Sequence, residues 1–251
     1  MSLTPFVYVD VPLDGANAGA VLHVDESTAK HLTTVLRLRA GAQVVVSDGL
    51  GRSATGELCD ATSVKLATAV SEQAPARVAV TLAQGVPKLK KMDTVVRLAT
   101  EGGAAAVWPV VTSRSPVKHA DVQSSRQQER LLAVRQAAGE QARRVYRLAL
   151  HEPTGFSAAC DALNGTPWLV CDAAGIAVHE AMRTVGPAAV NAGTLTVMVG
   201  PEGGFSAEEL REAKTAGAVV VRLADSVLRS EHAGLFAVGA VSTLLAALPE
   251  V

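Results

Sequence analysis

Two segments in the last quarter of the chain combine residue types that suit a ligand site. The first is Val197–Ser206, VMVGPEGGFS, in which an apolar run enters a glycine-rich loop and then a helix start. Glycines let a ligand approach the backbone closely, and the first turn of a helix offers free N–H groups. Glu202 places an anion in this loop, so a cationic or neutral ligand suits it better than a phosphate.

This loop lacks the common nucleotide-binding fingerprints. No Gly-Lys-Ser/Thr follows it, as a P-loop requires, and the second glycine of the GxGxxG spacing is missing. An ordinary turn between a strand and a helix is the structural alternative on local grounds.

The second segment is Leu223–Ala233, LADSVLRSEHA, which follows another apolar run. Ligands of open α/β sheets bind at the carboxyl ends of the strands, where both segments would lie. Arg229 and Glu231 either form an ion pair that fixes the last helix or face a substrate. We therefore expect the two loops to line one pocket.

The elements that must position these loops change character along the chain. Short strands with turn residues between them fill the first 70 residues and predict a small β-barrel. The expected strands there are 6–9, 20–24, 43–47, 53–58 and 64–69, with a short helix at 27–35. Residues 71–76, which include Pro75, suit a linker.

Apolar strands alternate with longer helices after this linker, which predicts an α/β domain with helices on both faces of the sheet. The expected strands are 78–84, 105–111, 168–172, 194–200 and 218–223. The expected helices are 90–102, 125–147, 206–217 and 231–248. Ser206 and Glu209 are spaced as a capping box at the start of the third of these helices.

Charge is distributed unevenly behind a formal net charge of −1. Residues 84–151 hold 12 basic and 5 acidic side chains, whereas residues 152–251 hold 5 basic and 11 acidic ones. A basic block of this density favours a polyanionic partner, with a solvated helix face as the alternative.

Other site classes are not favoured by the sequence. Cys59, Cys160 and Cys171 form no CxxC pair, and the histidines show no metal-ligand spacing, so no metal is expected and a reducing cytoplasm fits. The uncharged run Ala233–Pro249 is short for a membrane span and suits a buried or interface helix better.

Taken together, VGPEGGFSAEEL and the later LADSVLRSEHA resemble the signature of the RsmE-type 16S rRNA uridine-N3 methyltransferases of the SPOUT class. In that family the pattern is approximately IGPEGGFS-x-x-E followed by LG-x-x-ILR-x-ETA. The resemblance covers nearly the whole chain. Further matches are Pro87-Lys88, Met92, Ala99-Thr100-Glu101, Arg114-Ser115, Glu140-Gln141 with Arg144, His31-Leu32, Val35-Leu36-Arg37 and Asp48-Gly49.

The resemblance implies a two-domain homodimeric enzyme. Residues 1–72 would form a PUA-like β-barrel that helps to hold RNA, and residues 77–251 a SPOUT domain with a trefoil knot at about 168–240. S-adenosylmethionine would be the cofactor and 16S rRNA or the small ribosomal subunit the partner. The cofactor residues that the resemblance implies are Val199, Gly200, Pro201, Glu202, Gly203, Gly204, Leu223, Ala224, Val227, Leu228 and Arg229.

Methylation of uridine N3 requires loss of the N3 proton and an in-line approach to the methyl group. Arg229 and Arg114 are candidates for stabilising the uridine anion, and Glu101 and Glu231 for accepting the proton. A structural ion pair is an equal alternative for each of these four. The expected phosphate contacts are Lys88, Lys90, Lys91, Arg114, Arg143 and Arg144. Because few aromatic residues are present for base stacking, we expect RNA to be held by charge and shape.

Several positions depart from the family pattern. Ala224 stands where the pattern has glycine, His232 where it has threonine, and Thr4-Pro5 where an arginine is usual. These departures leave open a non-catalytic RNA-binding or ribosome-assembly protein that keeps the fold. An enzyme that binds ATP or NAD at the glycine-rich loop is the third hypothesis, disfavoured by Glu202 and the missing fingerprints.

Overall fold

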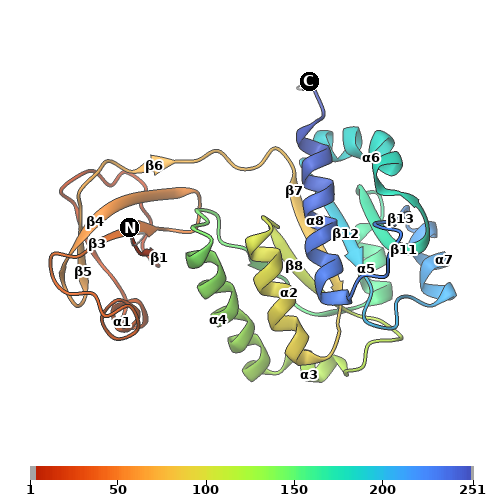
Figure 1. The fold of residues 1–251 in the computed structure, drawn as a ribbon, viewed down its shortest axis with the longest axis horizontal. Helices are drawn as coiled ribbons and strands as arrows, with labels where there is room; N and C mark the ends of the chain where they lie inside the picture. Colours follow the sequence, from red (N-terminus) through yellow and green to blue (C-terminus); the bar gives the residue numbers. More distant parts are fainter. Residues whose placement is uncertain (1–3, 250–251) are drawn as a thin grey trace. The chain divides into compact units, whose positions relative to one another are not determined.

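A computed structural model describes residues 4–249 of the chain (Figure 1). The chain divides into two compact units. The first runs to Pro75 and also takes in Gly139–Arg147, and the second comprises Ala76–Ala138 and the chain from Leu148 onward. Residues 1–3 and 250–251, the ends of the two expected domains, lie outside the described residues.

The first unit is built on a six-stranded sheet. Its strands are β1 (Phe6–Tyr8), β2 (Val21–His23), β3 (Gln43–Ser47), β4 (Arg52–Asp60), β5 (Ser63–Leu66) and β6 (Ser71–Glu72). The order is β1-β3-β4-β5-β2, and β6 pairs with β4 inside the expected linker. The strands expected to form a small β-barrel are therefore present, in one sheet whose strand order ends at β1 and β2. The expected helix is split into α1 (Glu26–Lys30) and the π-helical η1 (His31–Val35).

The segment Gly139–Arg147 belongs to this unit because it packs on β1. The Glu140 carboxylate accepts a hydrogen bond from the Tyr8 backbone N–H at 3.3 Å and contacts His31 Nε2 at 3.1 Å. The guanidinium of Arg143 lies 5.8 Å from the centre of the Phe6 ring, and that of Arg147 lies 4.5 Å from the Tyr8 ring. Cation–π contacts thus attach a basic segment to the sheet.

The same contacts end a helix earlier than the sequence predicts. The helix expected over 125–147 is α4 (Ser125–Gln141), and the prediction was wrong for its last residues. Arg143 adopts a positive φ of 53°, which a continuing α-helix does not allow. Contacts with β1 therefore override the pattern that predicted a helix as far as residue 147.

The second unit contains a parallel sheet, as the sequence predicts. Its strands are β7 (Ala79–Gly85), β8 (Ala106–Val111), β9 (Ala149–Leu150), β10 (Thr154–Gly155), β11 (Trp168–Ala177), β12 (Thr194–Val199) and β13 (Val219–Arg222). The order is β10-β8-β7-β12-β11-β13, and β9 also pairs with β8. Strands β7 and β12 are neighbours although more than 100 residues separate them in the sequence.

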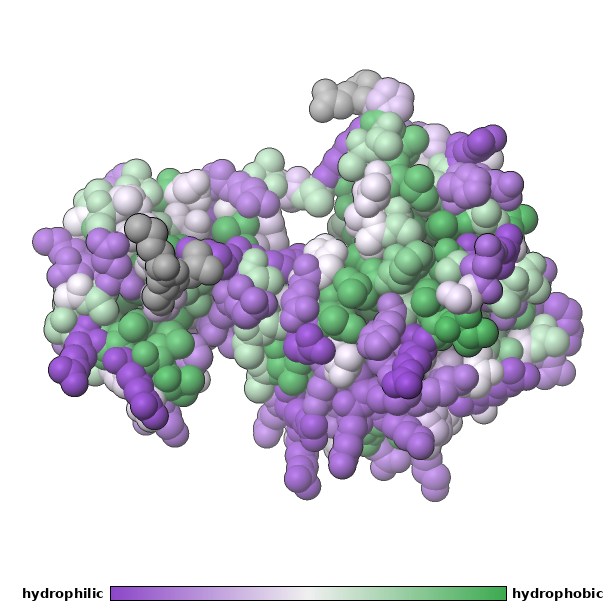
Figure 2. Space-filling view, in the orientation of Figure 1, coloured by the Kyte–Doolittle hydropathy of each residue, from purple (hydrophilic) through white to green (hydrophobic). Residues whose placement is uncertain are grey.

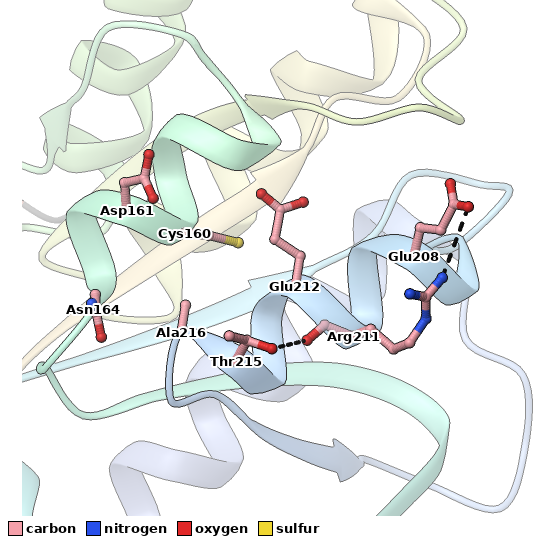
Figure 3. Close-up of a pocket in the computed structure, with 8 residues that line it drawn as sticks. All are labelled: Cys160, Asp161, Asn164, Glu208, Arg211, Glu212, Thr215 and Ala216. Carbon is pink, nitrogen blue, oxygen red and sulfur yellow. Dashed lines mark hydrogen bonds and ion pairs between the residues drawn. The ribbon is translucent and has the colours of Figure 1, made fainter.

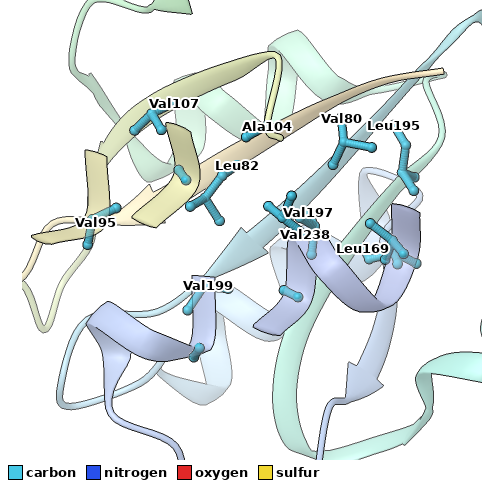
Figure 4. Close-up of a cluster of buried hydrophobic side chains, with 14 of the residues drawn as sticks. Val80, Leu82, Val95, Ala104, Val107, Leu169, Leu195, Val197, Val199 and Val238 are labelled. Carbon is cyan, nitrogen blue, oxygen red and sulfur yellow. The ribbon is translucent and has the colours of Figure 1, made fainter. Parts of the chain in front are cut away.

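Helices cover both faces of this sheet. On one face α2 (Leu89–Glu101), α6 (Val178–Ala192) and α8 (Ser230–Ala246) bury the large cluster that includes Leu82, Val197 and Val238 (Figure 4). On the other face α5 (Phe156–Leu163) and α7 (Ala207–Thr215) cover Trp168, Val170 and Met198. The short α3 (His119–Gln123) precedes α4. Helix α6, which contains Pro187, was missing from the sequence-based expectation. None of the helices within residues 4–249 has the length and apolar character that a membrane span requires.

Strand β11 is longer than expected and touches β13 twice. It pairs with β13 at Leu169–Cys171 and again at Ile176 and Ala177, with an irregularity between Cys171 and Ile176. Between these two contacts the backbone of Gly175 passes so close to β13 that a Cβ on it would lie 2.5 Å from the Val221 backbone. Only glycine permits this approach.

We therefore expect Gly175→Ala to lower the free energy of unfolding by about 1–3 kcal/mol, since backbone must move to admit the methyl group. Urea unfolding of the full chain, followed by circular dichroism, measures this change. The matched control is Gly155→Ala, because a Cβ on Gly155 would meet no atom within 4 Å. A loss in the control as large as in Gly175→Ala would show that the close approach is not the cause.

Candidate functional site

A cavity of about 670 Å³ lies at the carboxyl ends of the strands of the second unit. Its walls come from the loop after β12, the end of β13 and the segment after it, the middle of β11 and the first turns of α2 and α8. This is the location at which open parallel sheets bind ligands. The two loops singled out by their sequence therefore line one cavity.

Ten of the eleven residues expected to bind the cofactor line this cavity. They are Val199, Gly200, Pro201, Glu202, Gly204, Leu223, Ala224, Val227, Leu228 and Arg229. Gly203 is the exception: it is exposed, and a Cβ on it would lie 3.2 Å from Arg114 Cβ. The side chain of Val227 is fully exposed at the cavity.

Glycines allow the loop after β12 to fold tightly against its neighbours. A Cβ on Gly85, the last residue of β7, would lie 2.8 Å from Pro201 N, and a Cβ on Gly200 would lie 3.0 Å from Gly204 Cα. Gly204 itself has a positive φ of 65°, with nothing within 4 Å of an added Cβ. The loop is therefore compact toward β7 and open beside Gly204.

The start of α7 is fixed by the expected capping box and by one further contact. Ser206 Oγ accepts from the Glu209 N–H at 3.1 Å, and Glu209 Oε2 accepts from the Ser206 N–H at 2.8 Å. Glu209 is buried, and its Oε1 also accepts from the Ser113 N–H at 2.7 Å. Next to Ser113, Arg114 Nη1 donates to the Gly203 carbonyl at 2.7 Å. Arg114 thus holds the loop without lining the cavity.

A buried glutamine joins the two loops beneath the cavity. Gln84 is fully buried at the end of β7, and its Nε2 lies 3.0 Å from Gly85 O, 3.3 Å from Gly200 O and 3.0 Å from Ser230 Oγ. Ser230 Oγ in turn donates to Gly200 O at 2.7 Å. We call Gln84, Gly200 and Ser230 the polar hub. It fixes the spacing between the loop after β12 and the first turn of α8.

An ionic cluster makes a second connection between these segments. Lys91 Nζ, from the first turn of α2, lies 3.2 Å from Glu202 Oε1 and 3.1 Å from Glu231 Oε2. Glu202 belongs to the loop after β12, and Glu231 to the start of α8. We call these three residues the Lys91 cluster.

The Lys91 cluster keeps its three members charged. Hydrogen bonds to Glu231 and Glu202 raise the pKa of Lys91. Burial, the largest influence on Glu231, acts to raise its pKa, but hydrogen bonds from its own backbone N–H and from Lys91 outweigh burial and lower it. Burial likewise acts to raise the pKa of Glu202, but hydrogen bonds from its own backbone N–H and from Lys91 outweigh burial and lower it. A carboxylate whose pKa is lowered is a weaker proton acceptor.

The remaining candidates do not line the cavity. Glu101 lies at the other end of α2, about 15 Å along the helix axis from Lys91, and pairs with Arg97 at 3.3 Å. Lys88 and Lys90 are exposed at the start of α2. Arg143 and Arg144 belong to the first unit, where Arg143 is exposed and burial lowers the pKa of Arg144.

Some residues of the site were missed by sequence reasoning. Cys171 and Asp172 line the cavity from the middle of β11, where its pairing with β12 stops. The available signal was their position at the end of the expected strand 168–172. Gln84 ends the expected strand 78–84 as a polar residue in an apolar run, a similar signal. Lys91 was assigned to RNA phosphate, whereas it forms two ion pairs at the cavity. Ala224 lines the cavity, but His232 does not.

A second pocket of about 450 Å³ lies between α5 and α7 and contains none of the expected site residues (Figure 3). Asp161, Glu208 and Glu212 make it acidic, and Glu208 lies 3.8 Å from Arg211. Burial raises the pKa of Cys160 in its wall to about 12, so this thiol stays protonated and unreactive at neutral pH. No group of His, Cys, Asp or Glu side chains suited to a metal ion occurs among residues 4–249.

Comparisons with protein families and with curated sequences agree on one class. A family model described as an RNA methyltransferase domain matches residues 74–242, and one described as an RNA methyltransferase PUA domain matches residues 24–66. The Mycobacterium bovis protein named Ribosomal RNA small subunit methyltransferase E is 36% identical over 94% of this chain and 90% of its own length. The Bacillus subtilis protein of the same name is 26% identical over 84% of this chain and 86% of its own.

The fold is also similar to a solved structure. A Ribosomal RNA small subunit methyltransferase E from Neisseria gonorrhoeae, crystallised with S-adenosyl methionine, superposes with a TM-score of 0.82. The match covers 96% of this chain and 98% of that one at 24% identity. The likeness therefore extends over both units of the fold.

We expect Gln84→Leu to lower the free energy of unfolding by about 1–3 kcal/mol, because buried acceptors of the polar hub lose their donor. Urea unfolding measures this effect, with Gln123→Leu as the control at an exposed position of the same unit. Equal losses in the two variants would contradict a stabilising role for the hub.

Proposed function

Since this chain belongs to the RNA methyltransferase family, we propose that it methylates N3 of a uridine in 16S ribosomal RNA with S-adenosylmethionine as methyl donor. It is an rRNA methyltransferase of the same class as its curated relatives. The observation that carries the proposal is the cavity at the carboxyl ends of the sheet, lined by both signature loops.

The residues of the cavity fit S-adenosylmethionine. The volume suits a cofactor of this size, and the open side of Gly204 gives it access to the backbone. Glu202 supplies an anion toward a cofactor that carries a sulfonium and an ammonium group. The proposed cofactor contacts are the ten lining residues given above, largely through backbone groups, with Gly203 acting through the shape of the loop.

When bound, the cofactor supplies an electrophilic methyl group. The chain must place uridine N3 in line with it and stabilise the charge left when the N3 proton is lost. Arg229 is the best candidate for this stabilisation, because it lines the cavity and is exposed. Arg114 acts as a positioning residue through Gly203.

The two carboxylates considered as proton acceptors have different roles in this proposal. Glu231 is bound to Lys91, and its lowered pKa favours holding α8 and α2 together over accepting a proton. Glu101 pairs with Arg97 at the far end of α2, so it acts in the helix and not at the reacting atoms.

RNA is held by charge and shape in this proposal. The PUA-like first unit would bind rRNA or the small ribosomal subunit together with Lys88, Lys90 and Arg143, all of which are exposed. Arg144 and Arg114 would contribute from their more constrained positions, whereas Lys91 is committed to its cluster. A substrate of this kind is found in the cytoplasm, the compartment in which we expect the enzyme.

Two further features are proposed from the family resemblance. A trefoil knot over about 168–240 is supported by the double contact of β11 with β13 and by the close passage at Gly175. A homodimer is supported by α8, over which apolar side chains gather on the surface (Figure 2). Phe236 of this helix is a large apolar side chain that is 46% exposed.

Isothermal titration calorimetry with S-adenosylmethionine and mass spectrometry of 16S rRNA test the function. We expect micromolar binding by the purified protein, and loss of one methyl group from a single uridine in a strain that lacks the gene. Binding of ATP or NAD in place of S-adenosylmethionine would favour the nucleotide-enzyme hypothesis. Absence of cofactor binding at high micromolar concentration would instead favour the non-catalytic protein.

We expect Lys88→Glu to weaken rRNA binding and to flatten its dependence on salt, because one phosphate contact is replaced by repulsion. Cofactor affinity should be unchanged, since Lys88 is exposed and does not line the cavity. Filter binding at several salt concentrations measures the slope, with Lys214→Glu, exposed on α7, as the control. An unchanged slope in Lys88→Glu would argue against this end of α2 as an RNA contact.

A further inference from the structure

The charges of the Lys91 cluster do not cancel. One ammonium group is bound to two carboxylates, at 3.2 Å from Glu202 and 3.1 Å from Glu231. The cluster therefore carries one negative charge in excess. The pKa shifts of its members support the fully charged state, because that of Lys91 is raised and those of both carboxyls are lowered.

The other charges around the cavity offset one another. Arg222, the last residue of β13, pairs with Asp225, three residues further along the chain. Arg229 and Asp172 complete the charged lining with one charge of each sign. The six charged side chains of the lining therefore sum to zero, and the one negative charge in excess is that of the Lys91 cluster when the buried Glu231 behind the lining is counted.

The two carboxylates of the cluster differ in their access to a ligand. Glu231 is buried, its side chain is 9% exposed, and it is not part of the cavity lining. Glu202 lines the cavity, and its side chain is 33% exposed. Lys91 pairs with both carboxylates, but only Glu202 lines the cavity, so Glu202 is the carboxylate that an incoming cation meets.

We propose that the Lys91 cluster makes the cofactor cavity selective for a cation, with Glu202 as the residue that favours the sulfonium donor over its neutral demethylated product. This inference rests on the proposed function and extends it to the discrimination between the two states of the cofactor. S-adenosylmethionine and S-adenosylhomocysteine share the adenosine, ammonium and carboxylate groups. They differ in one methyl group and in the positive charge at sulfur.

The effect of one charge is measurable in a cavity of this size. A volume of about 670 Å³ corresponds to a width of roughly 9 Å, so a ligand inside it lies within the range of an incompletely screened charge. Removal of the negative charge of Glu202 should therefore change the ratio of the two dissociation constants by about fivefold to twentyfold, a range typical of one charge at such a distance.

Glu202→Gln tests the proposal, because it keeps the size of the side chain and removes its charge. The dissociation constants of S-adenosylmethionine and S-adenosylhomocysteine are measured by isothermal titration calorimetry of the full chain at neutral pH. We expect the ratio to shift by about fivefold to twentyfold toward the neutral product. Sinefungin, which carries a protonated amine in place of the sulfonium, should lose affinity as S-adenosylmethionine does.

Two variants serve as matched controls. Glu202→Asp keeps the charge and should keep the ratio within about twofold of the wild-type value. Glu208→Gln makes the same chemical change on α7, at a residue that does not line the cavity, and should leave the ratio unchanged. Thermal unfolding of each variant confirms that the fold is retained.

An equal loss of affinity for both ligands in Glu202→Gln would overturn the proposal, because Glu202 would then contact a group that the two ligands share. A shift of the same size in Glu208→Gln would also overturn it. Failure of the proposed function has a different signature: the wild-type protein would bind neither ligand.

Discussion

The position of both cavity loops depends on a polar group buried in the centre of an apolar sheet. Gln84 is the penultimate residue of β7, and its carboxamide N–H groups reach the loop after β12 and the first turn of α8. A buried amide that loses its acceptors is costly, so these segments hold a fixed spacing. Gly85 and Gly200 make this spacing attainable, because a side chain on either would collide with neighbouring backbone.

Ion pairs of Lys91 also connect the loop after β12 with the first turn of α8, and their effect differs from that of the polar hub. The neutral hub is fully buried and sets the shape of the cavity floor. The Lys91 cluster is partly exposed and sets the electrostatic potential that a ligand meets. One substitution in the hub therefore acts mainly on folding, whereas one in the cluster acts mainly on which ligand is preferred. Different residues of the site therefore determine its shape and its preference between ligands.

Sequence reasoning located the cavity because its loops are local features: glycine-rich turns that follow apolar runs. The parallel sheet and most strands were also predicted, because apolar runs are local features of the sequence. Sequence reasoning missed the hub and did not foresee the ion pairs of Lys91, because both involve segments that are distant in the sequence, such as β7 and β12, which are neighbours across more than 100 residues. The end of α4 was equally hidden, since Arg143 leaves the helix to contact Phe6, far away in the sequence. Contacts between distant segments leave no local pattern to read.

The segment Gly139–Arg147 has a consequence for how this protein can be taken apart. The chain crosses between its two units three times, after Pro75, after Ala138 and after Arg147. Excision of the first 75 residues would leave Arg143 and Arg147 without the aromatic rings on which they lie. A single cut in the chain therefore does not separate one unit from the other. A gene rearrangement that separated the two units would also have to replace the contacts made by the segment at the end of α4. The two units are therefore expected to be inherited together.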